Sequence, residues 1–367
     1  MKKKAAEQPL GVKEIARRAN VAIATVDRVI HNRPGVSLKT KNKIEQIIQE
    51  LNYQPNILAR RLASRKVLRL ATLIPKVSSE ETDFWTLPLA GIQKAEEEIK
   101  QFGVKIEPYY FDLNDRKSFV KTAKQMLKDP ADGILLAPSF IEESVSFIRS
   151  CSKLNIPYVF INSDIPQQES LCYIGPDLFR SGYQAGQLVH YCTPRHSGIL
   201  VLNISREIED HHHLLRKEEG LRAYFKDSKR PVIKCDIRQT DQRSIEKELS
   251  KALQHHPGIK AIFVTNSRVA AVSHYLEKKG KKDTLLIGYD FTQENVLRLD
   301  QGHIDFLICQ QPQEQGYRGI MALYQSLVLK VPVEKTHFMP IDIITKENHQ
   351  FYCDLYDFTD SPDKRRK

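Results

Sequence analysis

Beyond residue 67, short apolar runs alternate with amphipathic stretches, and this alternation restricts the fold more than any other feature of the sequence. The apolar runs have the length of strands and few polar positions, as in parallel sheets that are covered on both faces. The stretches between them, such as 88–102, 115–128 and 243–255, have helical spacing. Strands divided by helices predict a doubly wound α/β body with parallel sheets. The predicted strands are 68–74, 133–137, 157–161, 198–202, 261–264, 285–288 and 306–309.

The first 66 residues carry nearly all of the excess positive charge. They contain 15 Lys and Arg against 5 Asp and Glu, whereas the other 301 residues contain 41 and 40. A basic segment attached to an almost neutral body is typical of a module that binds a polyanion. We therefore expect a DNA-binding head in front of the α/β body.

Within this basic segment, apolar residues recur at helical spacing over 12–19 and again over 23–30, with Asn20 at the break between them. Ser37 is placed to cap a third helix that runs to about residue 52. Two short helices joined by a tight turn predict a small all-α helix-turn-helix head, whose second helix can enter the major groove of DNA. A protein-docking module or a merely solvated basic surface is the alternative interpretation.

Composition and motifs exclude several other classes of protein. No stretch approaches the roughly 18 apolar residues needed to cross a bilayer, so we expect a soluble, cytoplasmic protein without a membrane partner. The six cysteines are scattered without a Cys-x-x-Cys pair, so neither a disulfide framework nor a metal site is expected. Phosphate-loop, dinucleotide-binding and nucleophile-elbow motifs are missing, so we predict no cofactor and no enzymatic activity.

Several motifs at fixed spacing resemble the DNA-binding head of the LacI/GalR family of bacterial transcription regulators. They are the runs 11–21, 24–29, 36–37, 51–56, 58–59 and 62–63. The resemblance implies a flexible basic N-terminus over 1–10, a helix-turn-helix domain over 11–55 and a hinge helix over 56–66.

For the rest of the chain, the resemblance implies a two-lobed body like a periplasmic sugar-binding protein. This body, over 67–348, would bind a ligand between its lobes and form the dimer, and a C-terminal extension over 349–367 would follow it. Three crossovers would join the lobes. They are expected near 163–166, 310–312 and 337–340.

The resemblance also implies a homodimer that binds a double-stranded DNA operator. The residues implied to contact DNA are Ile23, Ala24, Thr25, Asp27, Arg28, Asn56 and Leu62. Leu62 would insert into the central minor-groove step, although packing against its partner helix is an alternative role. Asp27 departs from the family pattern, because a carboxylate is repelled by phosphate, although it could accept a hydrogen bond from cytosine.

Ligands of open α/β sheets lie beyond the carboxyl ends of the strands, and polar or aromatic residues follow several predicted strands. Together with the family pattern, this predicts a site for a polyhydroxylated ligand, a sugar or sugar acid, with an aromatic face and paired hydrogen-bonding groups. The predicted ligand residues are Phe84, Trp85, Asn162, Asp164, Arg216, Asn266, Asp290 and Gln310. Alternatives are a core position for Trp85, capping roles for Asn266 and Asp290, and Lys217 in place of Arg216.

Three consecutive histidines, 211–213, are interpreted as part of a loop before a helix, with His213 near the ligand, rather than as a metal site. We therefore predict a sequence-specific transcription regulator, a repressor, whose affinity for its operator is switched by the ligand. The alternatives are an enzyme with a sugar cleft that carries a DNA-binding head, and a DNA-binding protein that responds to no ligand.

Overall fold

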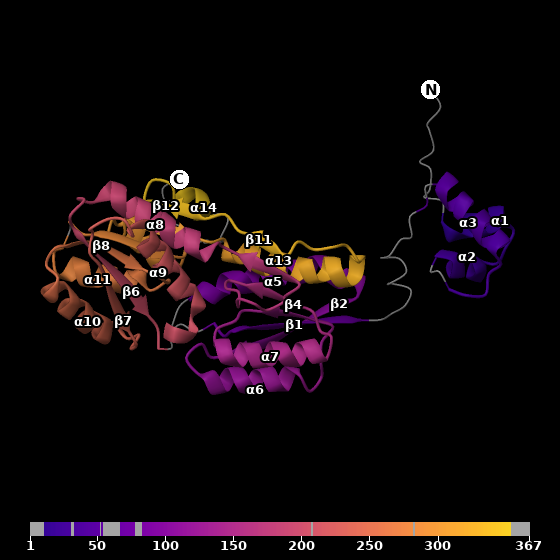
Figure 1. Cartoon of the computed structure of the whole chain (residues 1–367), viewed down its shortest axis with the longest axis horizontal. Coiled ribbons are helices and arrows are strands. Elements are labelled where there is room, and N and C mark those ends of the chain that lie inside the picture. Colours follow the sequence, from indigo (N-terminus) through magenta and orange to yellow (C-terminus); the bar gives the residue numbers. More distant parts are fainter. Residues whose placement is uncertain are drawn as a thin grey trace, which may run out of the picture. The chain divides into compact units, whose positions relative to one another are not determined.

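The computed structural model describes residues 11–30, 33–51, 53, 67–77, 83–206, 208–281 and 283–353 (Figure 1). The chain divides into two compact units, Met1–Ser64 and Arg65–Lys367. The first is a small helical head and the second an α/β body. The predicted N-terminus over 1–10, the hinge helix over 56–66 with Asn56 and Leu62, and residues 354–367 of the extension lie outside the described residues.

The head contains the three predicted helices, α1 (Val12–Ala19), α2 (Ile23–Ile30) and α3 (Leu38–Glu50). Asn20 ends α1 in the left-handed conformation (φ 57°) and its N–H donates to carbonyls in the last turn, which makes the tight turn. Ser37 accepts a hydrogen bond from the Thr40 N–H, as an N-cap does. The three helices bury one small apolar core: Ile15, Ala16, Ala19, Val26, Val29, Ile44 and Ile47.

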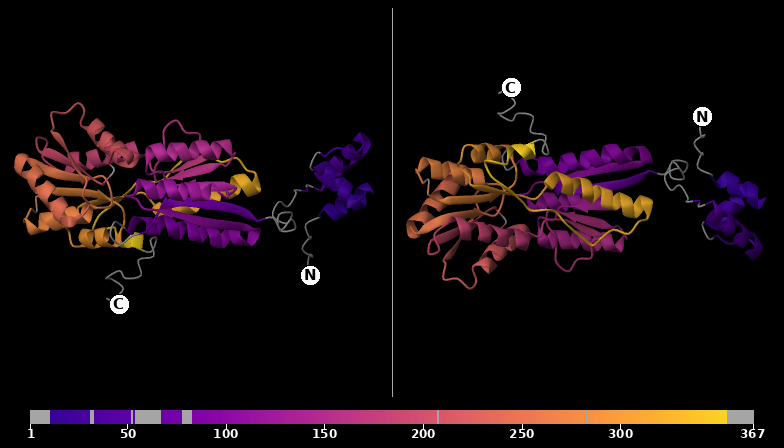
Figure 2. Two further views of the ribbon diagram at one scale, coloured as in Figure 1. Left: turned by 90° about the horizontal axis from the view of Figure 1, so that it is seen from below. Right: turned by 90° about the horizontal axis from the view of Figure 1, so that it is seen from above.

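The body has two lobes, each built around a six-stranded sheet. In the N-lobe all strands are parallel, in the order β11-β5-β4-β3-β1-β2. Helices α6 (Arg116–Met126) and α7 (Ile141–Lys153) cover one face, and α5 (Thr86–Ile99) and α13 (Pro312–Tyr324) pack together on the other (Figure 2). The strands are β1 (Leu68–Pro75), β2 (Val104–Phe111), β3 (Gly133–Leu136), β4 (Tyr158–Ile161), β5 (Cys172–Gly175) and β11 (Thr336–Phe338).

The C-lobe sheet has the order β12-β10-β9-β8-β6-β7 and is parallel except for β12, which runs antiparallel to β10. Helices α8 (Leu178–Cys192) and α9 (His212–Tyr224) cover one face. The other face is covered by α10 (Gln242–His255), α11 (Val269–Lys278) and α12 (Gln293–Asp300). The strands are β6 (Gly198–Ile204), β7 (Val232–Ile237), β8 (Ile259–Val264), β9 (Leu285–Tyr289), β10 (Phe306–Cys309) and β12 (Asp342–Ile344).

Short elements complete the body. The 3-10 helices are η1 (Asp83–Trp85), η2 (Lys100–Phe102) and η3 (Ile208–Asp210), and a π-helical turn, η4 (Gln325–Leu329), extends α13. The last described helix, α14 (Gln350–Cys353), buries Cys353 in the C-lobe core, so the beginning of the predicted extension packs as part of the body. Within the described residues, no helix combines the length and apolar character needed to span a bilayer.

The lobes are joined by three chain segments, at 176–177, 310–311 and 339–341, which follow β5, β10 and β11. The second and third agree with the predicted positions. The predicted crossover at 163–166 is wrong, because the chain that leaves β4 returns to the same sheet as β5. The short strand β5 was not predicted, and the crossover was therefore placed one strand too early.

Candidate functional site

Helix α2 of the head presents the predicted DNA-contacting residues to solvent. Val26 and Val29 are buried in the head core, so the residues between and before them point outward. Ile23 is 49% exposed, which is unusual for a large apolar side chain. The five predicted residues of α2, Ile23, Ala24, Thr25, Asp27 and Arg28, are all exposed or partly exposed.

Asp27, the residue that departs from the family pattern, lies beside a cation. The Arg33 guanidinium contacts its carboxylate at 3.3 Å, with both side chains largely exposed. A pair of this kind is weak in water, but it reduces the negative charge that α2 presents. Elsewhere in the head, Lys43 of α3 donates to the carbonyl of Ala19 at the end of α1 (3.0 Å) and so fixes the helix that precedes the turn.

The body contains a cavity of about 70 Å³ between the lobes, which we call the inner cavity. Six of the eight predicted ligand residues line it: Phe84, Trp85, Asn162, Asn266, Asp290 and Gln310. Further lining residues include Leu113, Asn114, Ser139, His211, His213, Lys217 and Arg268. Since these residues belong to both lobes, a ligand in the inner cavity would contact both.

The inner cavity lies where the carboxyl ends of the strands of both sheets meet. Ser139 follows β3 and Asn162 follows β4 in the N-lobe, whereas Asn266, Asp290 and Gln310 follow β8, β9 and β10 in the C-lobe. This is the position at which open α/β sheets bind ligands. Phe84 and Trp85, in η1, form an edge-to-face pair with ring centroids 5.2 Å apart and supply the aromatic surface.

Two buried amides that the sequence did not single out position this lining. Asn295 of α12 donates from one amide nitrogen to the carbonyls of Ser267, Tyr289 and Asp290, and thereby holds together the loops after β8 and β9. Gln315 of α13 accepts from the Asn162 N–H (2.9 Å) and donates to the Gln310 carbonyl (2.7 Å), which joins the loop after β4 to a crossover. Their role could not be read from the sequence, because both lie inside helices and act through backbone groups of distant loops.

Helix α9 places one basic side chain in the inner cavity. His213 and Lys217 are four residues apart and therefore lie on one face of the helix. Lys217 is 3% exposed; its Nζ donates to the Thr265 carbonyl (3.2 Å) and lies 3.6 Å from the centroid of the Tyr289 ring. Gly182 of α8 and Gly220 of α9 allow the two helices to approach closely and so bring this face to the cavity.

Burial alters the ionisation of the groups in the inner cavity. It raises the pKa of Asp290 to about 6, against the attraction of Lys217 and a hydrogen bond from Gln310. It lowers the pKa of Lys217 to about 8, against the attraction of Asp290. Burial also lowers the pKa of His211 to about 4 and that of His213 well below its ordinary value. At neutral pH Asp290 is thus mainly a carboxylate, Lys217 is mainly an ammonium and both imidazoles are neutral. The guanidinium of Arg268 lines the cavity as well.

Two polar atoms of the lining are buried without a hydrogen-bond partner among the described residues. They are Oε1 of Gln310 and Nδ1 of His211. A buried polar atom without a partner costs about 1–3 kcal/mol, which a hydrogen bond to a ligand would recover. Asn266 is different, because its amide already donates to the Ile204 carbonyl (2.7 Å) and accepts from the Arg268 N–H (3.3 Å). The predicted capping alternative for Asn266 therefore has structural support beside the ligand role.

Asp164 and Arg216 are not brought to the inner cavity. They line a separate depression of about 310 Å³, together with His212. Arg216 lies over the ring of Phe179 (5.2 Å) and is hydrogen-bonded to Glu219, whereas Asp164 approaches His212 at 3.7 Å. Because successive helical residues point in different directions, α9 can direct only one of Arg216 and Lys217 to the cavity, and it directs Lys217. A ligand role for Asp164 and Arg216 stays a prediction.

A helix-turn-helix head on a two-lobed, periplasmic-binding-type body defines a receptor that carries its own DNA-binding module. The model described as "Bacterial regulatory proteins, lacI family" matches residues 11–56, and the one described as "Periplasmic binding protein domain" matches residues 72–330. The chain belongs to the lacI family of bacterial regulatory proteins, with a sensor body of the periplasmic binding protein type. It is therefore a DNA-binding transcription regulator whose sensor is similar to sugar-binding proteins.

Relatives agree with this assignment. Catabolite control protein A from Priestia megaterium is 27% identical over 287 residues, which are 76% of this chain and 82% of that protein. The HTH-type transcriptional regulator RegA from Clostridium acetobutylicum is 29% identical over 159 residues, 43% of this chain and 45% of RegA, so the match spans less than half of the length of RegA.

Solved structures agree as well. A structure assigned to a LacI transcriptional regulator from Bacteroides fragilis has a TM-score of 0.72 at 29% identity, and the match covers 78% of this chain and all of that one (100%). GanP, a glucose-galactose binding protein from Geobacillus stearothermophilus, has a TM-score of 0.69 at 22% identity over 77% of this chain and 99% of GanP, which shows the shared fold of the body.

Proposed function

We propose that this protein is a repressor that binds a double-stranded DNA operator as a homodimer, and that a small polyhydroxylated effector, a sugar or sugar acid, sets its affinity for the operator. The single observation that carries the proposal is the inner cavity. It combines an aromatic pair with polar groups at the strand ends of both lobes, two of whose buried atoms have no partner among the described residues.

The chemistry of the inner cavity suits a sugar ring. The Phe84 and Trp85 rings offer an apolar surface to the C–H face of a ring. Asp290 accepts hydrogen bonds from hydroxyl groups, and Gln310 accepts through Oε1, while the Lys217 ammonium adds a charge-assisted donor. A carboxylate of a sugar acid would pair with the same ammonium.

The proposed coupling follows from the position of the inner cavity between the lobes. An effector that contacts both lobes favours the lobe arrangement that it fits best. The N-lobe begins with β1, directly after the predicted hinge helix, so its arrangement sets the spacing of the two hinges in a dimer. The effector thereby changes the free energy with which both heads of the dimer bind one operator.

The test uses the full-length protein. An operator is first selected from genomic fragments, and its affinity is then titrated with and without each member of a sugar and sugar-acid panel, while sedimentation velocity reports the oligomeric state. We expect one compound to change operator affinity by about tenfold or more. Asp290→Asn should bind the operator with unchanged affinity and lose the response. An effector that binds the protein yet leaves operator affinity unchanged would contradict the proposal.

We further propose that the inner cavity binds its effector without converting it and without a cofactor. Hydrolysis of a glycosidic bond ordinarily requires two carboxyl groups on opposite sides of that bond. Among the described residues that line the cavity, Asp290 is the only acid. Incubation of the protein with each bound sugar, followed by chromatography, should return the sugar unchanged; steady turnover would favour the enzyme alternative.

A further inference from the structure

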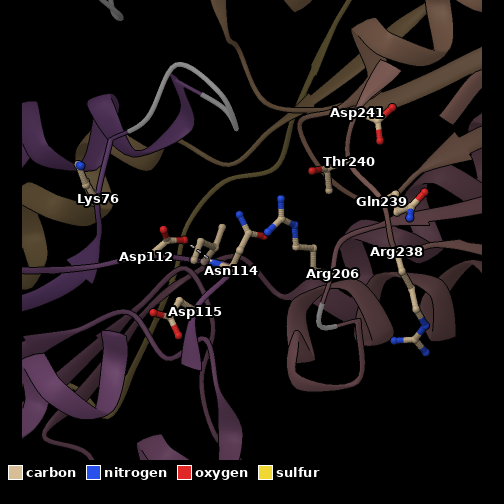
Figure 3. Close-up of a pocket in the computed structure, with 10 residues that line it drawn as sticks. Lys76, Asp112, Asn114, Asp115, Arg206, Arg238, Gln239, Thr240 and Asp241 are labelled. Carbon is tan, nitrogen blue, oxygen red and sulfur yellow. Dashed lines mark hydrogen bonds between the residues drawn. The ribbon is translucent and has the colours of Figure 1, made fainter. Parts of the chain in front are cut away.

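A large polar groove adjoins the inner cavity, and we call it the outer groove. It has a volume of about 850 Å³. One wall is the N-lobe residue Lys76 with the loop 112–115, and the other is the C-lobe residue Arg206 with the loop 238–241 (Figure 3). These segments follow β1 and β2 in one lobe and β6 and β7 in the other. The outer groove is thus built from equivalent positions of the two lobes.

The outer groove and the inner cavity share part of their lining. Leu113 and Asn114 border both. Because these two residues line both, a ring in the inner cavity lies next to the outer groove, and whatever is attached to the ring at this border lies in the groove.

Three side-chain donors of the outer groove have no partner among the residues that the structure describes. The side chains of Lys76, Arg206 and Asn114 make no hydrogen bond or ion pair there. The Arg206 side chain points across the space toward Asn114 on the opposite wall (Figure 3). Free donors on both walls of a continuous groove are positioned to bind a polar ligand rather than each other.

Acidic side chains of the outer groove already accept hydrogen bonds from nearby backbone N–H groups. Asp115 caps α6 through the Lys117 N–H (2.9 Å), and Asp241 caps α10 through the Ser244 N–H (2.9 Å). Their remaining lone pairs still face a groove that contains acids and bases on both walls. The described lining holds three basic and three acidic side chains, so it has no excess charge of either sign. Hydroxyl groups both donate and accept, and they match such a mixed lining. The chemistry favours a neutral polyhydroxylated unit.

We propose that the effector has at least two joined polyhydroxylated units, as a disaccharide has, with one unit in the inner cavity and the second in the outer groove. This inference rests on the proposed function, because it extends the same binding site. Phe84, Asp290 and Gln310 recognise the inner unit. Asn114 and Arg206 recognise the outer unit and make the protein selective for ligand length.

The experiment compares matched sugars on the full-length protein by isothermal titration calorimetry: glucose with maltose and cellobiose, galactose with lactose and melibiose, and xylose with xylobiose. At least one disaccharide should bind about tenfold or more tightly than either of its units, since two or three added hydrogen bonds supply such a factor. The variant Arg206→Ala should lose most of this preference and change the monosaccharide affinity by less than about twofold.

Two further variants separate the possible outcomes. Asp290→Asn should weaken disaccharide and monosaccharide alike, and Arg195→Ala, an exposed arginine of the same lobe outside the groove, should weaken neither. Equal affinities for disaccharides and their units would overturn the inference and leave the proposed function standing. Equal weakening of both ligands by the groove variant would also overturn it, because the groove would then act on lobe closure. If no sugar of either length binds, both this inference and the proposed function are contradicted.

Discussion

Burial disfavours the charged form of single side chains in the inner cavity, and Asp290 is the clearest case. Burial raises the pKa of its carboxyl group to about 6, because the neutral form loses less hydration than the anion. A carboxylate that accepts from two hydroxyl groups of a sugar must be ionised. Effector binding therefore competes with protonation of Asp290 just below neutral pH.

We expect effector affinity to fall as the pH drops from about 7 through 6 toward 5. The limiting slope is about tenfold per pH unit for one proton. Calorimetric titrations between pH 5 and 8 measure this profile. Asp290→Asn keeps an acceptor oxygen but does not titrate, so it should bind more weakly with a flat profile below about pH 7. A sloping profile in that variant would assign the dependence to another group.

Lys217 should reduce the stability of the free protein. Burial lowers the pKa of its ammonium group to about 8, whereas the unfolded chain has the ordinary value near 10.5. Below pH 8 both states are protonated and the folded state bears the full cost of burying the charge. Between pH 8 and about 10.5 the unfolded state binds more protons, so the free energy of unfolding contributed by this group rises with pH.

The variant Lys217→Met removes the buried charge, and with it the attraction that stabilises the Asp290 carboxylate. Relative to the wild type, we expect its free energy of unfolding to be about 1–3 kcal/mol higher at pH 7 than at pH 10, where the wild-type amine is largely neutral. Urea denaturation at both pH values measures it, and Lys226→Met, at an exposed lysine beyond the same helix, serves as the control. An equal difference from the wild type at both pH values would show that the charge of Lys217 is not responsible. The Lys217→Met variant should also lose effector binding.

The sequence could predict most of the polar lining, but not all of it. Asn162, Asp290 and Gln310 follow apolar strands directly, and a strand end fixes where such a residue must lie. Arg216 and Lys217 are inside a helix, where a shift of one position turns a side chain by about 100°. The choice between them depends on how α9 packs against α8, which the sequence does not state. For the same reason Asn295 and Gln315 were not predicted.

Among the elements, the contact between α8 and α9 controls the orientation of the inner cavity's basic residue. A Cβ atom on Gly220 would lie 2.0 Å from the Phe179 carbonyl oxygen, and one on Gly182 would lie 1.8 Å from that of Lys217. Backbone atoms cannot yield to such an overlap without moving the helix. The two glycines therefore set the distance between the helices, and with it the position of Lys217.

Gly220→Ala should push α9 away from α8, lower the free energy of unfolding by about 1–3 kcal/mol and weaken effector binding by more than the lost stability alone explains. Thermal unfolding and calorimetry measure the two effects. Gly258→Ala is the matched control, because a Cβ atom there meets nothing within 4 Å. If the control were as destabilising as Gly220→Ala, helix contact would not be the cause.

Strand prediction succeeded or failed according to position in the sheet. The seven predicted strands correspond to β1, β3, β4, β6, β8, β9 and β10. Four of the five missed strands, β2, β7, β11 and β12, are the edges of the two sheets. An edge strand is partly exposed, so it lacks the continuous apolar run that marks a strand covered on both faces. In β2, for example, Lys105, Pro108 and Tyr110 are exposed.

For the whole molecule, the charge distribution predicted a separate basic head and a larger, nearly neutral body, and the fold confirms this division. The basic excess ends where the α/β pattern begins, and the structure divides near the same point, into Met1–Ser64 and Arg65–Lys367. The two-lobed arrangement was also predictable, since about 300 residues of alternating strands and helices exceed one ordinary sheet. The first crossover was not, because its position depended on the missed strand β5.

This charge distribution predicts how DNA binding depends on salt. With an excess of ten positive charges in the first 66 residues of each chain, a dimer that contacts 6–10 phosphates should lose about 10³–10⁵ in operator affinity between 50 and 200 mM salt.

Arg28→Ala, on the exposed face of α2, should reduce the slope of log K against log salt by about two for a dimer, one for each head, if its guanidinium contacts phosphate. Arg195→Ala removes a charge from the body and should leave the slope unchanged. Fluorescence anisotropy with the selected operator measures all three slopes. Because release of counterions is counted per contact, an equal change in both variants would mean that the body also binds DNA, and the assignment of DNA binding to the head alone would be wrong.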